Sequence, residues 1–390
     1  MLLEYTGAIF LIIFSYAVPL LFSSIRNDKY RLAAFYIVIT SLQLVSLFNY
    51  FIFTLPGAGQ DASTFSYNAQ TAAINGVAPT FSVGTGVYEY ILFLSYSIFG
   101  INKLVGQSIS ILAAIVSCIF ILRIARHLDI QGNFATLLLI IVGLTPSFLF
   151  YTPLTFREVF QLLGLVGGIY FAYRAFSGRS LTNLIVSSVF FIFMGIFHHV
   201  LLALSFVLIL ITTVFYFVYS GTPKNLIIKN IFLSSLAILV VGYIIVVNIP
   251  AGKGNDYIKI LRESGGVVKM VGKYRNVVED DLPRSTYGFK VNTTSLMSTG
   301  YGLSLSYVHY LYGPGIYSIE EAIDLLPSLN ALGRLLATLL LLYLLIKKVP
   351  MPPGLGYLLI MYLSVTAMWS IGTTNYGQAF RHNSLTDWIL

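Results

Sequence analysis

Charge is scarce in this chain. Its 390 residues include 23 Lys and Arg and 15 Asp and Glu, so only 10% of the residues are charged. A soluble globular domain carries about 25% charged residues. Apolar residues make up 57% of the chain, and its mean hydropathy is +0.83. Because so few charges cannot cover a surface in water, the composition predicts an integral membrane protein whose surface lies mostly in lipid.

Cysteine and the common catalytic motifs are also missing. Cys118 is the single cysteine and lies in an apolar run, which excludes a disulfide framework and a cysteine-based zinc cluster. We interpret Cys118 as a small packing residue. No Walker loop, GxSxG elbow, HExxH helix or CxxC pair is present. We therefore predict no ATP hydrolysis, no metal site and no cofactor, and leave the participation of a divalent cation open.

Long apolar runs predict the fold class. A membrane-spanning helix needs about 20 mostly apolar residues. The chain reads as an all-α polytopic membrane protein, a single transmembrane domain over 1–390 with about ten membrane-crossing helices. The boundary after 181–197 is the hardest to place. The predicted spans are 7–24, 32–54, 104–122, 134–152, 158–176, 181–197, 200–219, 231–249, 329–346 and 354–372.

The distribution of Lys and Arg predicts the orientation. Five alternate loops hold eleven cations and two acids, whereas the rest of the chain holds twelve cations and thirteen acids. Positive charge concentrates in cytoplasmic loops, so these five loops are predicted to be cytoplasmic. The net charge of +8 therefore reflects topology, and we predict no nucleic-acid partner. The five loops are 25–31, 123–133, 174–180, 220–230 and 347–353.

This orientation places three segments outside the cytoplasm. They are the first outer loop, 55–103, the long outer loop, 250–328, and the C-terminal stretch, 373–390. Within the first, the apolar run 88–100 has only 13 residues, too few to span. We interpret it as an interfacial or re-entrant helix. The mixed composition of 253–290 is typical of a small cap over the membrane surface.

Three charged residues at the predicted outer ends of the spans are candidates for catalysis. Asp61 follows a Gly-rich turn that lets its carboxylate fold back over the bundle, where it can act as a general base. A turn or helix-capping aspartate is the simpler alternative. Arg157 and Glu158 lie between two apolar spans, and Arg157 offers a planar set of donors that matches phosphate oxygens. Local pairing of the two is the alternative.

Five further residues are candidate contacts for a lipid phosphate or glycan. His198 and His199 lie in apolar sequence, but adjacent helical residues point about 100° apart and so make poor joint metal ligands. A buried hydrogen-bonding role suits them equally. Arg381 and His382 form a cationic pair just beyond the last span that can hold a lipid phosphate; interfacial anchoring is the alternative. Arg284 is the preferred candidate in the long outer loop.

The order of these features resembles the GT-C type of membrane glycosyltransferases. The resemblance consists of Asp61 soon after a span, the run 88–100, and a span closing at Arg123 and Arg126. The Pro-Ser-Phe to Arg-Glu hairpin that ends at Glu158 is similar to one in bacterial polysaccharide polymerases of the Wzy and EpsG kind.

One motif and one residue spacing extend the resemblance, and two features depart from it. The stretch 377–382 resembles the Gly-Thr-Ala-x-Arg-His close of large bacterial exopolysaccharide membrane proteins. Arg157 and Gly168 have the R-x10-G spacing of Wzy polymerases. However, only one carboxylate stands where many GT-C enzymes have two. In addition, 387–390 lies where the pattern would begin another helix.

The resemblance implies a function. The expected enzyme is a glycosyltransferase of the bacterial cytoplasmic (inner) membrane that takes sugars from undecaprenyl-(pyro)phosphate on the outer face. Repeat-unit polymerase of O-antigen, capsule or exopolysaccharide is the favoured form, and a single-sugar transferase the next. The implied partners are the polyprenyl-linked glycan, membrane lipid, and polysaccharide chain-length or export proteins.

Two other readings stay open. A lipid-linked oligosaccharide flippase or transporter needs polar residues inside the membrane, and we expect only His198 and His199 to come close. A non-enzymatic scaffold or an acyltransferase-like protein is the other. A membrane acyltransferase is expected to pair a histidine with a carboxylate in the membrane, and no such pair is evident in the sequence.

Overall fold

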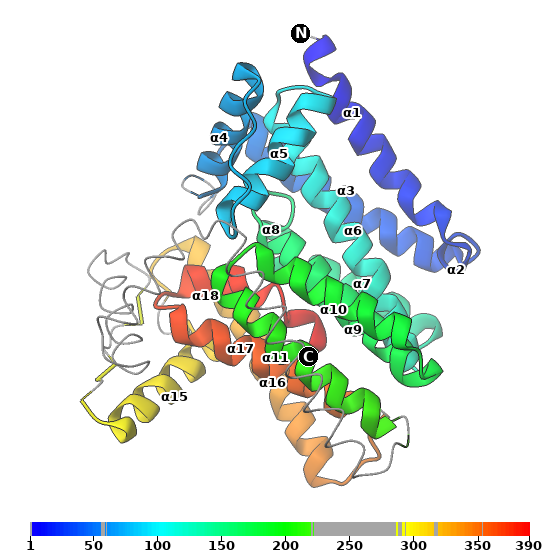
Figure 1. Cartoon of the computed structure of the whole chain (residues 1–390), viewed down its shortest axis with the longest axis vertical. Helices are drawn as coiled ribbons and strands as arrows, with labels where there is room; N and C mark the ends of the chain where they lie inside the picture. Colours follow the sequence, from blue (N-terminus) through cyan, green and yellow to red (C-terminus); the bar gives the residue numbers. More distant parts are fainter. Residues whose placement is uncertain are drawn as a thin grey trace. The chain divides into compact units, whose positions relative to one another are not determined.

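Helices account for the regular structure of the part of the chain described here (Figure 1). The computed structural model describes residues 2–55, 59, 61–219, 221, 286–287, 291–292, 294–315, 319–352 and 354–390. Across these residues the only β-type contact is an isolated antiparallel bridge between Thr286 and Asn375. The predicted all-α class is confirmed. The predicted span 231–249 and most of the proposed cap, 253–290, lie outside the described residues.

The described chain forms two compact units, each considered by itself. The N-terminal unit is Met1–Gly252 with Pro352–Leu358, and the C-terminal unit is Lys253–Met351 with Leu359–Leu390. Helices of the N-terminal unit are α1 (Leu2–Ala17), η1 (Val18–Leu21), α2 (Ser23–Arg26), α3 (Lys29–Phe51), α4 (Asp61–Asn75), α5 (Thr85–Phe99), α6 (Lys103–His127), α7 (Gly132–Leu144), α8 (Pro146–Tyr151), α9 (Glu158–Gly178), α10 (Leu181–Ile196) and α11 (His199–Tyr219).

The C-terminal unit contains fewer described helices. They are α15 (Leu296–Tyr312), η3 (Ala322–Asp324), α16 (Leu325–Ile346), the greater part of α17 (Leu355–Gly372), α18 (Tyr376–Asn383) and η4 (Asp387–Ile389). Within its described residues, the long outer loop predicted over 250–328 thus contains α15, η3 and the first residues of α16. The predicted C-terminal stretch, 373–390, folds into α18 and η4.

Six helices of the described chain are long and apolar enough to cross a membrane by length and composition. They are Lys29–Phe51, Lys103–His127, Glu158–Gly178, His199–Tyr219, Ala322–Ile346 and Leu355–Gly372. Three shorter apolar helices are Tyr5–Leu21, Gly132–Leu144 and Leu181–Ile196. These helices characterise a multi-pass membrane protein. The count of ten spans stays a prediction.

Prolines interrupt two of the predicted spans. The span predicted over 7–24 leaves the α-helix at Ala17, and Pro19 lies in the 3-10 turn that follows. The span predicted over 134–152 breaks at Thr145. This residue stands directly before Pro146, and its ψ of 132° is not helical. Proline lacks an N–H donor, and its ring drives the preceding residue out of the α conformation. By contrast, the uncertain boundary near 198 is a true break, because α10 ends at Ile196 and α11 begins at His199.

Glycines let α9 approach α10 closely. A Cβ on Gly164 would lie 2.7 Å from the backbone nitrogen of Met194, and one on Gly168 would lie 2.5 Å from the Phe191 ring. The Ser187 hydroxyl donates to the Gly168 carbonyl at 2.7 Å. Small residues and interhelical hydrogen bonds are the usual means of helix packing in lipid. Gly168, the glycine of the R-x10-G spacing, therefore has a packing role. The close packing of α9 against α10 also fixes the position of the residues at the start of α9.

Candidate functional site

The first candidate residue, Asp61, opens α4, and this helix start is packed against the chain that precedes α9. The Thr155 hydroxyl donates to the Ala62 carbonyl at 2.7 Å. Around this bond, Leu55, Ala62, Leu154 and Phe156 form a buried hydrophobic cluster. Asp61 and Arg157 therefore lie on neighbouring segments of one unit. The Asp61 side chain is exposed, and a carboxylate at a helix start is stabilised by the helix dipole.

The start of α9 is also hydrogen-bonded to the short connection between α10 and α11. The Arg157 guanidinium donates from Nη1 to the Phe197 carbonyl at 3.1 Å. On the same turn, the Gly84 amide, at the start of α5, donates to the Ile196 carbonyl at 2.8 Å. His199 opens α11, and its Nε2 lies 3.4 Å from the point where a Cβ on Gly84 would stand. Gly84 has φ of +98°, which a side chain there would strain.

These contacts bring four helix N-termini together, and we call this region the helix-start cluster. It contains the first residues of α4, α5, α9 and α11. Each N-terminus carries roughly half a positive charge and unpaired N–H groups, which is why helix starts bind anions. Arg157, which is partly exposed, adds a full positive charge. The helix starts and Arg157 thus contribute positive potential to this region, and Asp61 and Glu158 contribute two carboxylates.

Aromatic rings pack between α4, α5, α9 and the turn that follows α10. Ring centroids are 5.5 Å apart for Phe65 and Tyr88, 5.7 Å for Tyr88 and Phe160, and 5.6 Å for Phe160 and Phe197. Burial, followed by smaller contributions that include the charge of Glu158, raises the pKa of Tyr88 well above its ordinary value. Tyr88 thus stays neutral at physiological pH. This packing fixes the positions of the helix starts.

The predicted site residues of this unit differ in their surroundings. Glu158 is the first residue of α9 and is only 3% exposed, so it is not open to solvent as Asp61 is. The His198 Nδ1 accepts from the Val200 amide at 3.3 Å and so caps the start of α11. A group of three or more histidine, cysteine or acidic side chains able to hold a metal ion is not found in the part of the chain that is described.

The remaining predicted residues belong to the C-terminal unit or lie outside the described residues. His382, on α18, is 7% exposed and its ring stacks on Trp369 with centroids 3.7 Å apart. Its Nδ1 is 3.3 Å from the Thr373 hydroxyl. Arg381 is partly exposed on the same helix. Arg284 lies outside the described residues. A single pocket that unites Asp61 and Arg157 with Arg381 stays a prediction.

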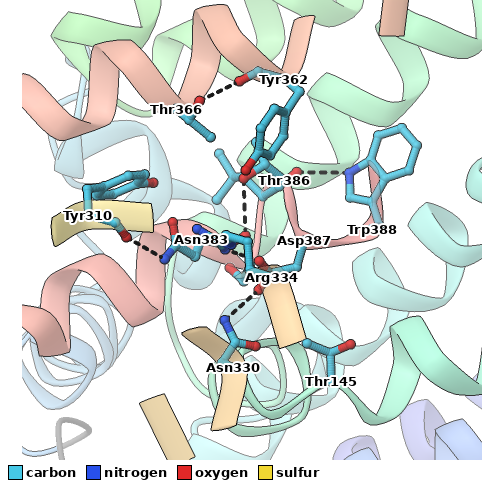
Figure 2. A network of polar contacts seen from close by, with 12 residues as sticks. Thr145, Tyr310, Asn330, Arg334, Tyr362, Thr366, Asn383, Thr386, Asp387 and Trp388 are labelled. Atoms are coloured by element: carbon cyan, nitrogen blue, oxygen red, sulfur yellow. Dashed lines mark hydrogen bonds and ion pairs between the residues drawn. The ribbon is translucent and has the colours of Figure 1, made fainter. Parts of the chain in front are cut away.

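Sequence reasoning missed a buried ion pair in the C-terminal unit (Figure 2). Arg334, in the middle of α16, is 3% exposed and donates from Nη2 to the Asp387 carboxylate. The Asn330 amide donates to the other oxygen of Asp387 at 3.1 Å. The expectation that only His198 and His199 bring polarity into the spans was wrong. The signal was available, because Arg334 stands inside the predicted span 329–346 and a charge there calls for a partner.

Further polar groups surround this pair. Within the described residues, the Nε and Nη1 atoms of Arg334 have no hydrogen-bond partner, and neither do the hydroxyls of Tyr310 and Tyr362. The Asn383 amide donates to the Tyr310 carbonyl at 3.2 Å and joins α18 to α15. The C-terminal unit therefore has a polar interior at the depth of a candidate span. This was unexpected from hydropathy alone.

Comparison with known protein families, with characterised proteins and with solved structures finds no match for this chain.

Proposed function

We propose that the chain is a membrane glycosyltransferase. It acts on polyprenyl-(pyro)phosphate-linked sugars at the outer face of a bacterial cytoplasmic membrane, as a repeat-unit polymerase in surface-polysaccharide assembly. The observation that carries the proposal is the helix-start cluster. Four helix N-termini and Arg157 belong to segments that contact one another, and Asp61, whose side chain is exposed, opens one of these helices. Positive potential near a carboxylate suits transfer from a phosphate leaving group.

The proposed step needs no nucleotide. Asp61 accepts the proton of an acceptor hydroxyl as the oxygen attacks the anomeric carbon of the donor sugar. The bond between that carbon and the phosphate oxygen breaks, and the lipid (pyro)phosphate leaves with the electron pair. Arg157 and the N–H groups of the helix starts bind the negative charge that develops. Removal of one well-placed donor of this kind costs about 3–4 kcal/mol of transition-state stabilisation.

A lipid-linked oligosaccharide flippase or transporter is the second candidate. Arg334 and Asp387 favour it, because charged residues within a membrane-spanning helix mark transport pathways in many carriers. The pair has no net charge, so it also serves as a structural link. The transferase is preferred because the helix-start cluster combines an exposed carboxylate, suited to a general base, with positive potential suited to a phosphate leaving group.

Genetic complementation separates these functions. The gene is deleted in its host and the surface polysaccharide is resolved on a gel. The deletion is complemented with wild type, Asp61→Asn or Arg157→Ala. The matched controls are Asp129→Asn and Arg126→Ala. They remove exposed charges at or just beyond the C-terminal end of α6, outside the helix-start cluster. Expression of every variant is checked by immunoblot.

Each result has a distinct meaning. We expect the deletion to abolish the long-chain ladder and to retain single-repeat material. Complementation with Asp61→Asn or Arg157→Ala should leave this pattern unchanged, whereas both controls should restore the ladder. Loss of all polysaccharide, including the single repeat, would favour a flippase or an earlier transferase. Full complementation by both Asp61→Asn and Arg157→Ala would refute the site. The biochemical counterpart is elongation of lipid-linked repeats by purified protein without any nucleotide.

A further inference from the structure

A groove with a mixed apolar and polar lining lies between α4 and α5 in the N-terminal unit, and we call it the α4–α5 groove. These helices pack side by side (Figure 1), and the cavity between them and the connecting loop measures about 540 Å³. Its lining includes Tyr67, Asn68, Thr71, Asn75 and Glu89. Amide, hydroxyl, phenol and carboxylate groups are thus presented together by two helices of the first outer loop.

The charge of the groove restricts its ligand. Among the described residues that line the groove, Glu89 is the one that carries a charge, and none is Lys or Arg. A carboxylate without a compensating cation disfavours phosphates and other anions. The groove is therefore suited to a neutral ligand with many hydroxyl groups, and it differs in this respect from the helix-start cluster.

Two side chains are held in place to receive hydroxyl groups. The Asn68 Nδ2 donates to the Glu89 Oε1 at 2.9 Å, which fixes both groups across the groove. Within the described residues, the Asn68 carbonyl oxygen and the second oxygen of Glu89 are further acceptors, and the second N–H of Asn68 is a further donor. Tyr67 is 68% exposed beside them and offers an aromatic face of the kind on which the apolar face of a sugar ring packs.

The register of α4 connects the groove to Asp61. Asp61, Asn68 and Asn75 are spaced seven residues apart, so they lie within about 20° of one another at each step around the helix. Each step rises about 10 Å along the axis. The three side chains form a stripe that begins at the proposed general base and ends in the groove. An oligosaccharide along this stripe would place its terminal sugar beside Asp61.

We propose that the α4–α5 groove binds the glycan of the acceptor, with its terminal hydroxyl directed to Asp61. The inference rests on the proposed glycosyltransferase function and adds the substrate class, a neutral oligosaccharide, and the residues that select it. Tyr67, Asn68 and Glu89 are binding residues and take no part in proton transfer.

Binding and kinetics test this proposal separately from catalysis. The probes are oligosaccharides released by partial acid hydrolysis of the host polysaccharide, and inorganic phosphate as the anionic comparison. Their binding to full-length protein in lipid nanodiscs is measured by calorimetry for wild type, Tyr67→Ala, Asn68→Ala and Glu89→Ala. Glu89→Gln retains an acceptor for Asn68, and Tyr30→Ala removes an equally exposed tyrosine, 64% exposed, from α3.

We expect the three groove variants to weaken oligosaccharide binding at least tenfold and to raise the acceptor KM with kcat little changed. Glu89→Gln should restore most of the binding, and Tyr30→Ala should behave as wild type. Unchanged acceptor KM and binding in all three groove variants would refute the inference and leave the proposed function intact. Wild-type protein that neither binds the oligosaccharide nor elongates lipid-linked repeats would refute both.

Discussion

The Arg334–Asp387 pair allows the strongest prediction about stability. Arg334 is 3% exposed, and the side chains of Arg334 and Asp387 are 1% and 10% exposed. Arg334→Met would remove the cation and keep the hydrogen bond from Asn330 to the carboxylate at 3.1 Å. Removal of one member of a buried ion pair costs about 3–5 kcal/mol, because the other charge is left uncompensated.

The double variant tests the cause of that loss. Arg334→Met with Asp387→Leu removes both charges, and replacement of a whole buried pair by apolar side chains is often nearly neutral. Asn330 then loses its partner, and an unsatisfied buried amide costs about 1–3 kcal/mol. The double variant should therefore be more stable than either single variant. A double-mutant cycle should give a coupling of at least about 2 kcal/mol.

The molecule contains a convenient probe for this measurement. Its two tryptophans, Trp369 and Trp388, both belong to the C-terminal unit, so tryptophan fluorescence reports on the unfolding of that unit. Each variant is titrated from mild detergent into SDS, and the midpoints are compared. Lys347→Met removes an exposed cation at the end of the same helix and should shift the midpoint little. Equal shifts for Arg334→Met and Lys347→Met, or a coupling near zero, would refute the reasoning.

Other predictions concern packing, pH and a buried hydroxyl. Gly164→Ala should destabilise the N-terminal unit by about 1–3 kcal/mol, because its Cβ would meet the backbone of α10 at 2.7 Å. Gly178→Ala, with open space around it, should be neutral. Exposure of the buried Cys118 thiol to a reactive dye on heating measures both. Burial lowers the pKa of His309, so the C-terminal unit should lose stability as pH falls below about 6.5. His309→Gln should flatten that dependence of the fluorescence midpoint, and an unchanged slope would contradict it. Tyr357→Phe removes a 2.9 Å hydrogen bond to a threonine of α11 and should cost about 1 kcal/mol in the dye assay.

The candidate site illustrates which features can be predicted locally. Asp61 and Arg157 were selected because charge is rare beside apolar runs, and that is visible in the sequence. Their adjacency was not, since it depends on a hydrogen bond between Thr155 and Ala62, 93 residues apart in the chain. The role of His198 as a cap of α11 also required the structure, because hydropathy does not reveal where α10 ends.

The fold divides in the same manner. Composition and apolar run length determined the helical membrane class. The free energy of transferring a segment into lipid is approximately a sum of contributions from its single residues, and these can be read from the sequence. The helix α4 escaped prediction because its Ser, Thr, Asn and Gln residues give no apolar run. It is held by packing against α5 and by the hydrogen bond between Ser66 and Tyr96 at 2.7 Å.

The sequence by itself determined that the surface of this protein lies mostly in lipid, that its helices are of the apolar membrane type, and where its rare charges stand along the chain. Only the tertiary structure decided which of those residues meet. The α4–α5 groove and the Arg334–Asp387 pair, 53 residues apart, depend on contacts between distant segments. Such contacts form only when the helices pack, and neither local propensity nor hydropathy records them.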